Sequence, residues 1–320
     1  MQQTTVSAPE RVLPPGMGAG VAAGLAAGAL WGTTFVAPLV APGFSSVDYT
    51  AGRFIACGLF ALLWMLWQTG RTSPALRRHL WPTAEQARAA LGLSVLGYTG
   101  YYLLLVYGIA DAGAAVPALI IGTLPLWMML LGKPDRMRWS ALGPGLVLTA
   151  GGMALMLAVS ADQVQFDGHG NFWRGVLLAT AAMLSWLAFG LLNARWLRTH
   201  TQVRSTAWAN WLGLAAGLGG LGLWLLWGTP MAELVSRPGF GRFLLVCTFT
   251  GIGSAWVAAV LWNVASRRLS PSLAGQLVVS ETVFALLYAF AWSGAWPAPA
   301  QFLACLLFVG GILASIRAHR

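Results

Sequence analysis

The feature that most constrains the fold of this chain is a succession of long apolar segments separated by short polar gaps. A helix needs about 20 apolar residues to cross the hydrocarbon core of a bilayer, and ten segments approach or exceed that length. They cover residues 17–40, 46–69, 88–110, 113–132, 140–160, 173–197, 205–227, 242–265, 271–292 and 299–317. The composition agrees, because 58% of the residues are hydrophobic and only 9% are charged, against roughly a quarter in a soluble protein. We therefore predict an all-α polytopic membrane protein with ten transmembrane helices.

The few charges are mostly basic, and their positions predict the orientation of the helices. Nineteen Lys and Arg residues against nine Asp and Glu give a net charge of +10, which in a soluble protein would suggest a nucleic-acid partner. Here the basic residues lie in the gaps instead of forming a face. Fifteen fall on the side that includes both chain ends, three fall on the other side, and Arg53 lies inside a segment. Because Lys and Arg are enriched in cytoplasmic loops, we predict that both termini, including the tail 1–16, are cytoplasmic.

Two other interpretations of the apolar segments are disfavoured. The first segment follows Arg11 as a signal peptide would, but at about 24 residues it is longer than a typical signal core. The three cysteines lie inside apolar segments, where they act as small hydrophobic residues, so no disulfide framework is expected. All four histidines fall outside the segments, and we expect neither a metal site nor a cofactor.

The second half of the chain weakly repeats the first at an offset of about 155 to 159 residues. The matches occur in the same order in both halves: 29–35 with 184–189, 48–51 with 204–207, and 150–153 with 309–312. We therefore predict two repeats of five helices, residues 17–160 and 173–317. Because five is odd, the second repeat enters the membrane from the opposite side. Many secondary transporters use such an inverted repeat for alternating access.

Small residues and prolines predict how these helices pack and bend. In the first segment glycine recurs every four residues, at Gly16, Gly20, Gly24, Gly28 and Gly32. Such a stripe lets two helix backbones approach closely. Pro117 and Pro125 in the fourth segment each remove a helix hydrogen bond, so we predict a kink there. A freed carbonyl is tolerated at membrane depth only inside the protein or beside a cavity, which also suits a hinge.

Ionisable and amide side chains at membrane depth are costly, so each is a candidate for function. Glu281 is the only carboxylate near the middle of a segment. It fits a protonated hydrogen-bond donor, a proton-coupling site, a counter-charge for a substrate ammonium group, or a contact that fixes helix packing. We predict that Arg53 is mainly structural, pairing with Asp48 or reaching the interface, with a substrate carboxylate as the third option. Hydrogen bonding between helices is the predicted role of Asn193, Asn210, Asn263 and Gln276.

The seventeen tryptophans and six tyrosines indicate where a cavity lies. Eleven tryptophans lie near segment ends, where the interfacial belt of membrane proteins explains them. Nearer the middle of four segments lie Trp31, Trp127, Trp186 and Trp256, and a further group in the third segment is Tyr98, Tyr101 and Tyr102. A buried indole N–H or phenol O–H needs a hydrogen-bond partner. We therefore predict that these seven residues line a polar cavity and bind substrate, although bulky packing explains any single one equally well.

Several of these residues resemble the repeat of one known family. The fragments Ala29-Leu30-Trp31-Gly32, Arg53-Phe54 and Leu124-Pro125-Leu126, with paired glycines in the fifth and tenth segments, look like the drug/metabolite transporter superfamily, the EamA-like ten-helix carriers. The resemblance covers residues 17–317, and the aromatic content is most similar to the YddG-type aromatic amino acid exporters of the bacterial inner membrane. It implies ten helices arranged as two inverted halves. Segments 1, 3, 4, 6, 8 and 9 would line a central cavity, and segments 5 and 10 would lie at the periphery. One position departs from the family: many relatives have Glu-Pro where this chain has Glu281-Thr282, so the proline expected to kink the ninth segment is missing.

These features together predict a secondary transporter of the inner membrane that exports aromatic or other bulky amino acids and related metabolites. Stacking on aromatic walls, about 0.5 to 1.5 kcal/mol per ring pair, suits a weakly held substrate that must be released. An exporter of cationic drugs or quaternary ammonium compounds is the alternative, because Glu281 with tryptophan faces also makes a cation–π site. A membrane-embedded enzyme would need a polar catalytic cluster, and a channel would need a charged ring or filter loop; the sequence shows neither. We expect a small-molecule substrate and the lipid bilayer as partners, with no nucleic acid and no required oligomer.

Overall fold

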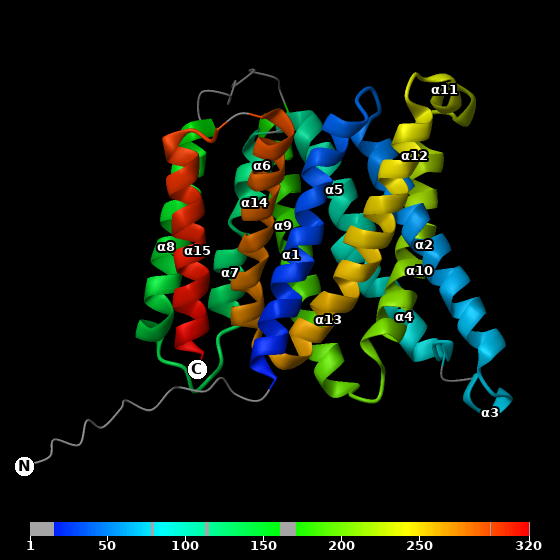
Figure 1. Ribbon diagram of the computed structural model, residues 1–320, viewed down its shortest axis with the longest axis horizontal. Helices are drawn as coiled ribbons and strands as arrows, with labels where there is room; N and C mark the ends of the chain where they lie inside the picture. The colour runs from blue at the N-terminus through cyan, green and yellow to red at the C-terminus, as the bar shows by residue number, and fades with distance from the viewer. Residues whose placement is uncertain (1–15, 78–79, 113–114, 161–170, 295, 320) are drawn as a thin grey trace, which may run out of the picture.

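The computed structural model describes residues 16–77, 80–112, 115–160, 171–294 and 296–319, and every regular element among them is a helix (Figure 1). The first half contains α1 (Met17–Val40), α2 (Ser46–Arg71), α3 (Pro74–Arg77), α4 (Ala84–Ser94), η2 (Val95–Thr99), α5 (Gly100–Ala112), α6 (Ala115–Gly122), α7 (Leu124–Leu131) and α8 (Trp139–Ser160). The second half contains α9 (Phe172–Thr199), α10 (Ser205–Trp227), α11 (Met231–Ser236), α12 (Phe240–Phe249), η4 (Thr250–Val257), α13 (Ala258–Arg268), α14 (Pro271–Ser293) and α15 (Pro299–Ala318). The predicted all-α fold is confirmed.

Nine stretches of the described residues are long and apolar enough to span a membrane, one fewer than predicted. The exception is the predicted fourth segment, where the longest apolar helical stretch is only Ile120–Leu131. Its helix is interrupted at Thr123, whose backbone N and Oγ1 both donate to the carbonyl of Ile120, at 3.1 and 2.7 Å. The bend predicted here therefore takes the form of a break between two short helices.

One of the two prolines of this segment lies where a helix tolerates it. Pro125 is the second residue of α7, and Pro117 lies in α6, which is described from Ala115 onward. The backbone N–H groups of a first helical turn have no partner within the helix, so Pro125 costs no hydrogen bond. Pro125 thus helps to start α7 directly after the break.

Two spans contain a widened π-helical turn. The turn η2 lies between α4 and α5, and η4 lies between α12 and α13. They begin at Val95 and Thr250, which are 155 residues apart, the same offset as the sequence repeat. A π turn adds one residue per turn and so rotates the side chains that follow it; such turns are frequent at functional sites.

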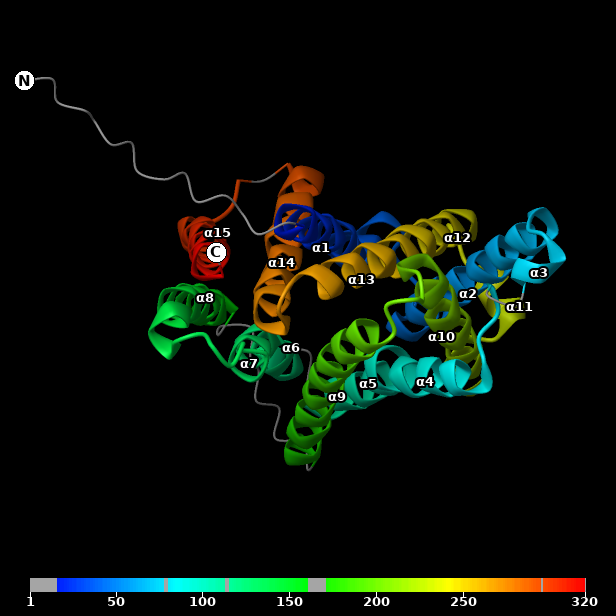
Figure 2. The same ribbon diagram turned by 90° about the horizontal axis from the view of Figure 1, so that it is seen from below.

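The helices are arranged as a bundle with one pair set apart at its edge. Seen from below, α1, α13 and α14 form one side and α4, α5 and α9 form the opposite side, while α8 and α15 stand together outside (Figure 2). Helix α1 packs against α13 and α14, α2 against α10, and α5 against α9. The pairs α2–α10 and α8–α15 each join one helix from either half of the chain.

The predicted glycine stripe of α1 is confirmed as a packing face. A Cβ added at Gly20 or Gly24 would lie 2.9 Å from Leu269 or 2.6 Å from Leu277. One added at Gly32 would lie 2.9 Å from the backbone nitrogen of Ala285. Larger side chains at these positions would push α1 away from α13 and α14.

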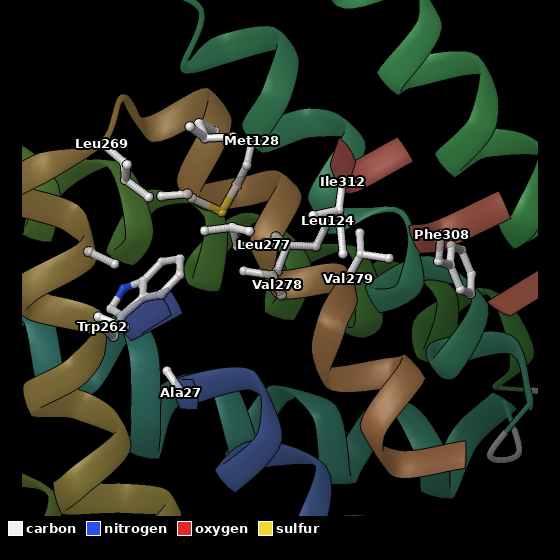
Figure 3. Packing of buried hydrophobic residues seen from close by; sticks show 14 of the residues in the cluster. Ala27, Leu124, Met128, Trp262, Leu269, Leu277, Val278, Val279, Phe308 and Ile312 are labelled. Atoms are coloured by element: carbon white, nitrogen blue, oxygen red, sulfur yellow. The ribbon is translucent and has the colours of Figure 1, made fainter. Parts of the chain in front are cut away.

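Helix α14 packs against several other helices of the bundle. Leu277, Val278 and Val279 lie between Leu124 and Met128 of α7 and the side chains of α15, including Phe308 and Ile312 (Figure 3). Close packing from several sides fixes the rotation of α14 about its axis. The residues of the next turn, including Glu281, are therefore held in a defined direction.

All four amides that were predicted to join helices do so. The bonds are Trp208 Nε1 to Asn193 Oδ1 at 2.7 Å, Asn193 Nδ2 to Asn263 Oδ1 at 3.3 Å, Trp256 Nε1 to Asn210 Oδ1 at 2.8 Å, and Gln276 Nε2 to Thr149 Oγ1 at 2.8 Å. Each bond connects two different helices, and the amides are at most 2% exposed. Their hydrogen-bonding role is therefore confirmed.

Candidate functional site

Aromatic rings from five helical elements form a continuous chain inside the bundle. Their centroids are separated by 5.3 Å for Trp31–Trp262, 6.4 Å for Trp262–Trp186, 6.0 Å for Trp186–Phe189, 5.6 Å for Phe189–Tyr98 and 5.6 Å for Tyr98–Phe54. We call these six residues the aromatic chain. The neighbours come from α1, α13, α9, η2 and α2, and their spacing is that of favourable aromatic pairs. Three residues predicted to line a cavity, Trp31, Trp186 and Tyr98, are thus brought into one assembly.

The other three members of the aromatic chain were not singled out in the sequence. Trp262 lies three residues before the end of its predicted segment, where it resembles an interfacial residue. In the structure it is 2% exposed, and its indole N–H has no partner in the described part of the chain. Phe189 follows Trp186 by three positions, so helical spacing alone places both rings on one face of α9. Phe54 directly follows Arg53, which is the one signal that pointed to it.

Two predicted cavity residues lie apart from the aromatic chain. Trp256 packs against Phe60 and Trp64 of α2, with ring centroids 4.9 and 5.9 Å away, and its indole N–H is bound by Asn210. Trp127 is 44% exposed, and its indole N–H donates to Thr123 Oγ1 at 3.2 Å. Trp256 therefore has a complete set of packing and hydrogen-bonding partners without any ligand.

The predicted ion pair between Arg53 and Asp48 is not formed. The carboxylate of Asp48 accepts from Ser45 Oγ at 2.7 Å and from the backbone N and Oγ1 of Thr229 at 2.8 and 2.7 Å. Asp48 is the third residue of α2, where its bonds to Ser45 form a capping box. Arg53 is five residues further on, about 140° around the helix, so it points away from this cap. Asp48 joins the start of α2 to the end of α10 without help from Arg53.

The guanidinium group of Arg53 has no hydrogen-bond acceptor among the described residues. Its Cζ lies 4.8 Å from the ring centroid of Phe54, the last ring of the aromatic chain, and its Nε is buried without a partner. Glu281, Tyr101 and Tyr102 lie within electrostatic range of its charge. The hydroxyl of Tyr102 itself donates to the carbonyl of Ser46. These three predicted residues are therefore among the ionisable neighbours of Arg53.

Glu281 lies in the middle of α14 and is only partly exposed. Helix α14 continues without interruption through Glu281 and Thr282, as expected from the absence of a proline at position 282. The carboxylate makes no hydrogen bond or ion pair within the described ranges, where the ion pairs are Arg174–Asp111 and Arg237–Glu233. A carboxylate without a partner in the middle of a span is costly, which makes Glu281 a candidate for function.

An exposed ion pair joins the end of α5 to the start of α9. Nε and Nη2 of Arg174 donate to the two carboxylate oxygens of Asp111, at 2.6 and 2.8 Å. The hydrogen bond from Arg174 lowers the pKa of the Asp111 carboxyl below its usual value. At the opposite end the same two spans leave a pocket of about 340 Å³, lined by Ala89, Leu93, Leu192, Arg195, Trp196 and Thr199. None of the predicted binding residues lines that pocket.

Metal-binding residues do not gather in the described part of the chain. No group of three or more His, Cys, Asp or Glu side chains there is placed to hold a metal ion. Two of the four histidines, His79 and His169, lie outside the described residues. The candidate site described above consists of aromatic rings and isolated charges.

Comparison with known proteins gives consistent results. Residues 18–158 match the EamA-like transporter family. The chain is 31% identical over 298 residues to the inner membrane protein YtfF of Escherichia coli, covering 89% of this chain and 90% of that protein. It is 23% identical over 224 residues to a probable terminal-alkyne amino-acid exporter of Streptantibioticus cattleyicolor, covering 68% and 69% of the two chains. A crystal structure with 22% identity has the same fold, with a TM-score of 0.72 over 95% of this chain and 99% of that one.

Proposed function

Because this chain belongs to the EamA-like transporter family of the drug/metabolite transporter superfamily, we propose that it exports aromatic or other bulky amino acids by alternating access. The chain is a multi-pass protein of the inner membrane, and its family indicates a transporter rather than an enzyme. One relative is named as an amino-acid exporter, which supports an amino acid as the substrate here. The finer identity of that amino acid rests on the arguments that follow.

The observation that carries the proposal is the aromatic chain. It connects α1 and α2 of the first half with α9 and α13 of the second, so a ring of the substrate has aromatic partners from both halves. Each good ring pair contributes about 0.5 to 1.5 kcal/mol beyond the burial of area. Interactions of this size bind a substrate specifically but weakly, as release on the other side of the membrane requires.

We further propose that α6 and α7 together form the tenth span and that residues 17–160 and 173–317 are inverted repeats. The 155-residue offset between η2 and η4 supports the repeat, as does the pairing of α2 with α10 and of α8 with α15. The beginning of α1 and the end of α15 lie at the same end of the bundle, as an even number of spans requires (Figure 1). The break at Thr123, flanked by Pro117 and Pro125, would then act as the hinge of the fourth span.

The topology is tested with reporters fused at defined positions. Fusions after residues 75, 135 and 200 should report the cytoplasm, and fusions after residues 44 and 235 should report the opposite side. The position after residue 135 is decisive, because it follows the broken span. An outside signal there would mean that α6 and α7 do not cross the membrane.

The substrate class is tested by counterflow in proteoliposomes that contain the purified full chain. We expect uptake of labelled L-phenylalanine that unlabelled L-phenylalanine or L-tryptophan suppresses and that tetraphenylphosphonium does not. Trp186→Ala should raise the KM for L-phenylalanine about two- to tenfold, the loss expected from removing one or two ring contacts. The matched control is Trp173→Ala on the same helix, because Trp173 is 75% exposed and lies outside the aromatic chain.

Two outcomes would contradict the proposed function. If tetraphenylphosphonium is exchanged and L-phenylalanine is not, the protein is an exporter of lipophilic cations. If Trp186→Ala and Trp173→Ala change KM equally, the aromatic chain does not contact the substrate.

A further inference from the structure

Two side chains of opposite charge inside the membrane-spanning helices lack partners in the described part of the chain. Arg53 of α2 makes no hydrogen bond, and its Nε is sealed from solvent. Glu281 of α14 makes neither a hydrogen bond nor an ion pair. Unpaired ions at membrane depth are costly, and where they persist they mark the path of a substrate or ion.

The helix backbones that carry the two charges are each packed closely against a neighbour. Helix α2 is held against η4 at Gly251, where an added Cβ would lie 2.6 Å from the carbonyl oxygen of Arg53. Helix α14 is held against α1 at Gly28 and Gly32, where an added Cβ would lie 3.2 Å from the backbone N or O of Glu281. Both backbones are thus fixed by close glycine contacts.

The surroundings of the two charges include both polar groups and aromatic rings. Arg53 and Glu281 lie within electrostatic range of each other without forming an ion pair, and Tyr101 lies within range of both. That hydroxyl makes no hydrogen bond to a described residue, whereas the hydroxyl of Tyr102 is bound to the carbonyl of Ser46. The aromatic chain ends at Phe54, directly under the guanidinium group. A ligand placed here meets a cation, an anion, a free phenol and aromatic rings.

We propose that Arg53 and Glu281 bind the two charged ends of one zwitterionic amino acid, Arg53 its α-carboxylate and Glu281 its α-ammonium group. The planar guanidinium fork fits a carboxylate, and the carboxylate of Glu281 accepts the hydrogen bonds of an ammonium group. A zwitterion neutralises both charges, whereas a ligand with one charge leaves the other unpaired. This inference rests on the proposed export of amino acids and assigns the binding of the charged ends to two residues.

Ligands that lack one charge test the assignment. We would measure binding to the purified full chain in nanodiscs of three ligands: L-phenylalanine, its methyl ester, which lacks the carboxylate, and 3-phenylpropionate, which lacks the ammonium group. The parent protein should bind L-phenylalanine at least tenfold more tightly than either analogue. Arg53→Gln should weaken L-phenylalanine about tenfold or more and leave the ester unchanged. Glu281→Gln should weaken L-phenylalanine and leave 3-phenylpropionate unchanged.

Two controls keep the test specific. Arg242→Gln removes an exposed arginine near the start of α12 and should change no affinity. Arg53→Lys retains the charge without the fork and should recover part of the loss, which would not follow if Arg53 served only folding.

The outcomes separate this inference from the proposed function. Equal binding of L-phenylalanine and its methyl ester by the parent, or equal weakening of both by Arg53→Gln, would overturn the inference even where L-phenylalanine is transported. Absence of binding and counterflow for L-phenylalanine would overturn the proposed function and the inference together.

Discussion

Two sets of polar residues inside this bundle differ in one respect. Around Asn193, every polar side chain has a partner: the amide accepts from Trp208 and donates to Asn263, which in turn donates to the carbonyl of Ser205 at 3.3 Å. Around Arg53 and Glu281 the charges have none within the described residues. A buried polar group left unpaired costs free energy, so natural proteins retain one where function requires it.

From this comparison we expect the Asn193 network to serve stability and Arg53 to serve transport. Removing a member of the Asn193 network should damage folding and leave transport by the folded molecules intact. Removing Arg53 should have the opposite effect, because it contributes no hydrogen bond to the folded chain. The following predictions test this separation, beginning with the largest expected effect.

The largest effect on stability is expected from Asn193→Leu. This change leaves the indole N–H of Trp208 and the Oδ1 of Asn263 buried without partners, at about 1 to 3 kcal/mol each. The midpoint of thermal unfolding in detergent should fall by several degrees. Asn171→Ala is the control, because Asn171 is exposed and its side chain does not cap α9. An unchanged midpoint for Asn193→Leu would show that the network does not stabilise the fold.

A double-mutant cycle on Gln276 and Thr149 should give a measurable coupling energy, smaller than the loss of stability expected from Asn193→Leu. Each of Gln276→Leu and Thr149→Val leaves a buried partner unpaired and should lower the unfolding free energy by about 1 to 3 kcal/mol. The double variant should be more stable than the sum of the two losses implies, by about 1 kcal/mol, because it removes both partners at once. Simple additivity would mean that the bond between α14 and α8 contributes nothing.

Arg53→Met should leave stability unchanged or raise it slightly. The variant removes an unpaired buried charge and retains an apolar contact to Phe54, and the lost cation–π contact offsets the gain in part. Its thermal midpoint should therefore be no lower than that of the parent. A fall as large as that of Asn193→Leu would mean that Arg53 is a structural residue, as the sequence alone predicted.

The smallest effect is expected at the exposed pair Asp111–Arg174. Arg174→Gln should lower the thermal midpoint only marginally at neutral pH, because exposed ion pairs contribute little. The pKa of Asp111 is lowered in the folded state, so the contribution of the pair is present at neutral pH and disappears as the pH falls through that lowered pKa. Unfolding of the parent and the variant should therefore differ at pH 7 and coincide in strong acid. A difference that grows in acid would contradict this sign.

Much of the architecture follows from local sequence patterns. The apolar segments predicted nine of the observed spans, and the spacing of Gly20, Gly24 and Gly32 predicted the face on which α1 packs. The length of an apolar segment and the spacing of glycines along a helix are local patterns, so they can be read directly from the sequence. The break at Thr123 was predicted only as a kink, because proline marks where a helix is weakened and not how far it opens.

The site was predicted less completely, because its residues depend on contacts between distant segments. Trp262 resembles an interfacial tryptophan in the sequence, and only the packing of α13 against α1 reveals its position between Trp31 and Trp186. Asp48 was predicted as the partner of Arg53 from their closeness in the sequence. The structure gives Asp48 a different partner, Thr229, which is 181 residues away.

One experiment tests the central claim, that the Asn193 network holds the bundle together and Arg53 binds the substrate. Thermal unfolding of the parent, Arg53→Met and Asn193→Leu is measured with and without saturating L-phenylalanine, since a ligand that binds only the folded state raises the midpoint. The account predicts that Arg53→Met keeps the parent midpoint and loses the shift produced by L-phenylalanine, whereas Asn193→Leu has a lower midpoint and keeps that shift. A lower midpoint with an intact shift for Arg53→Met would contradict the account.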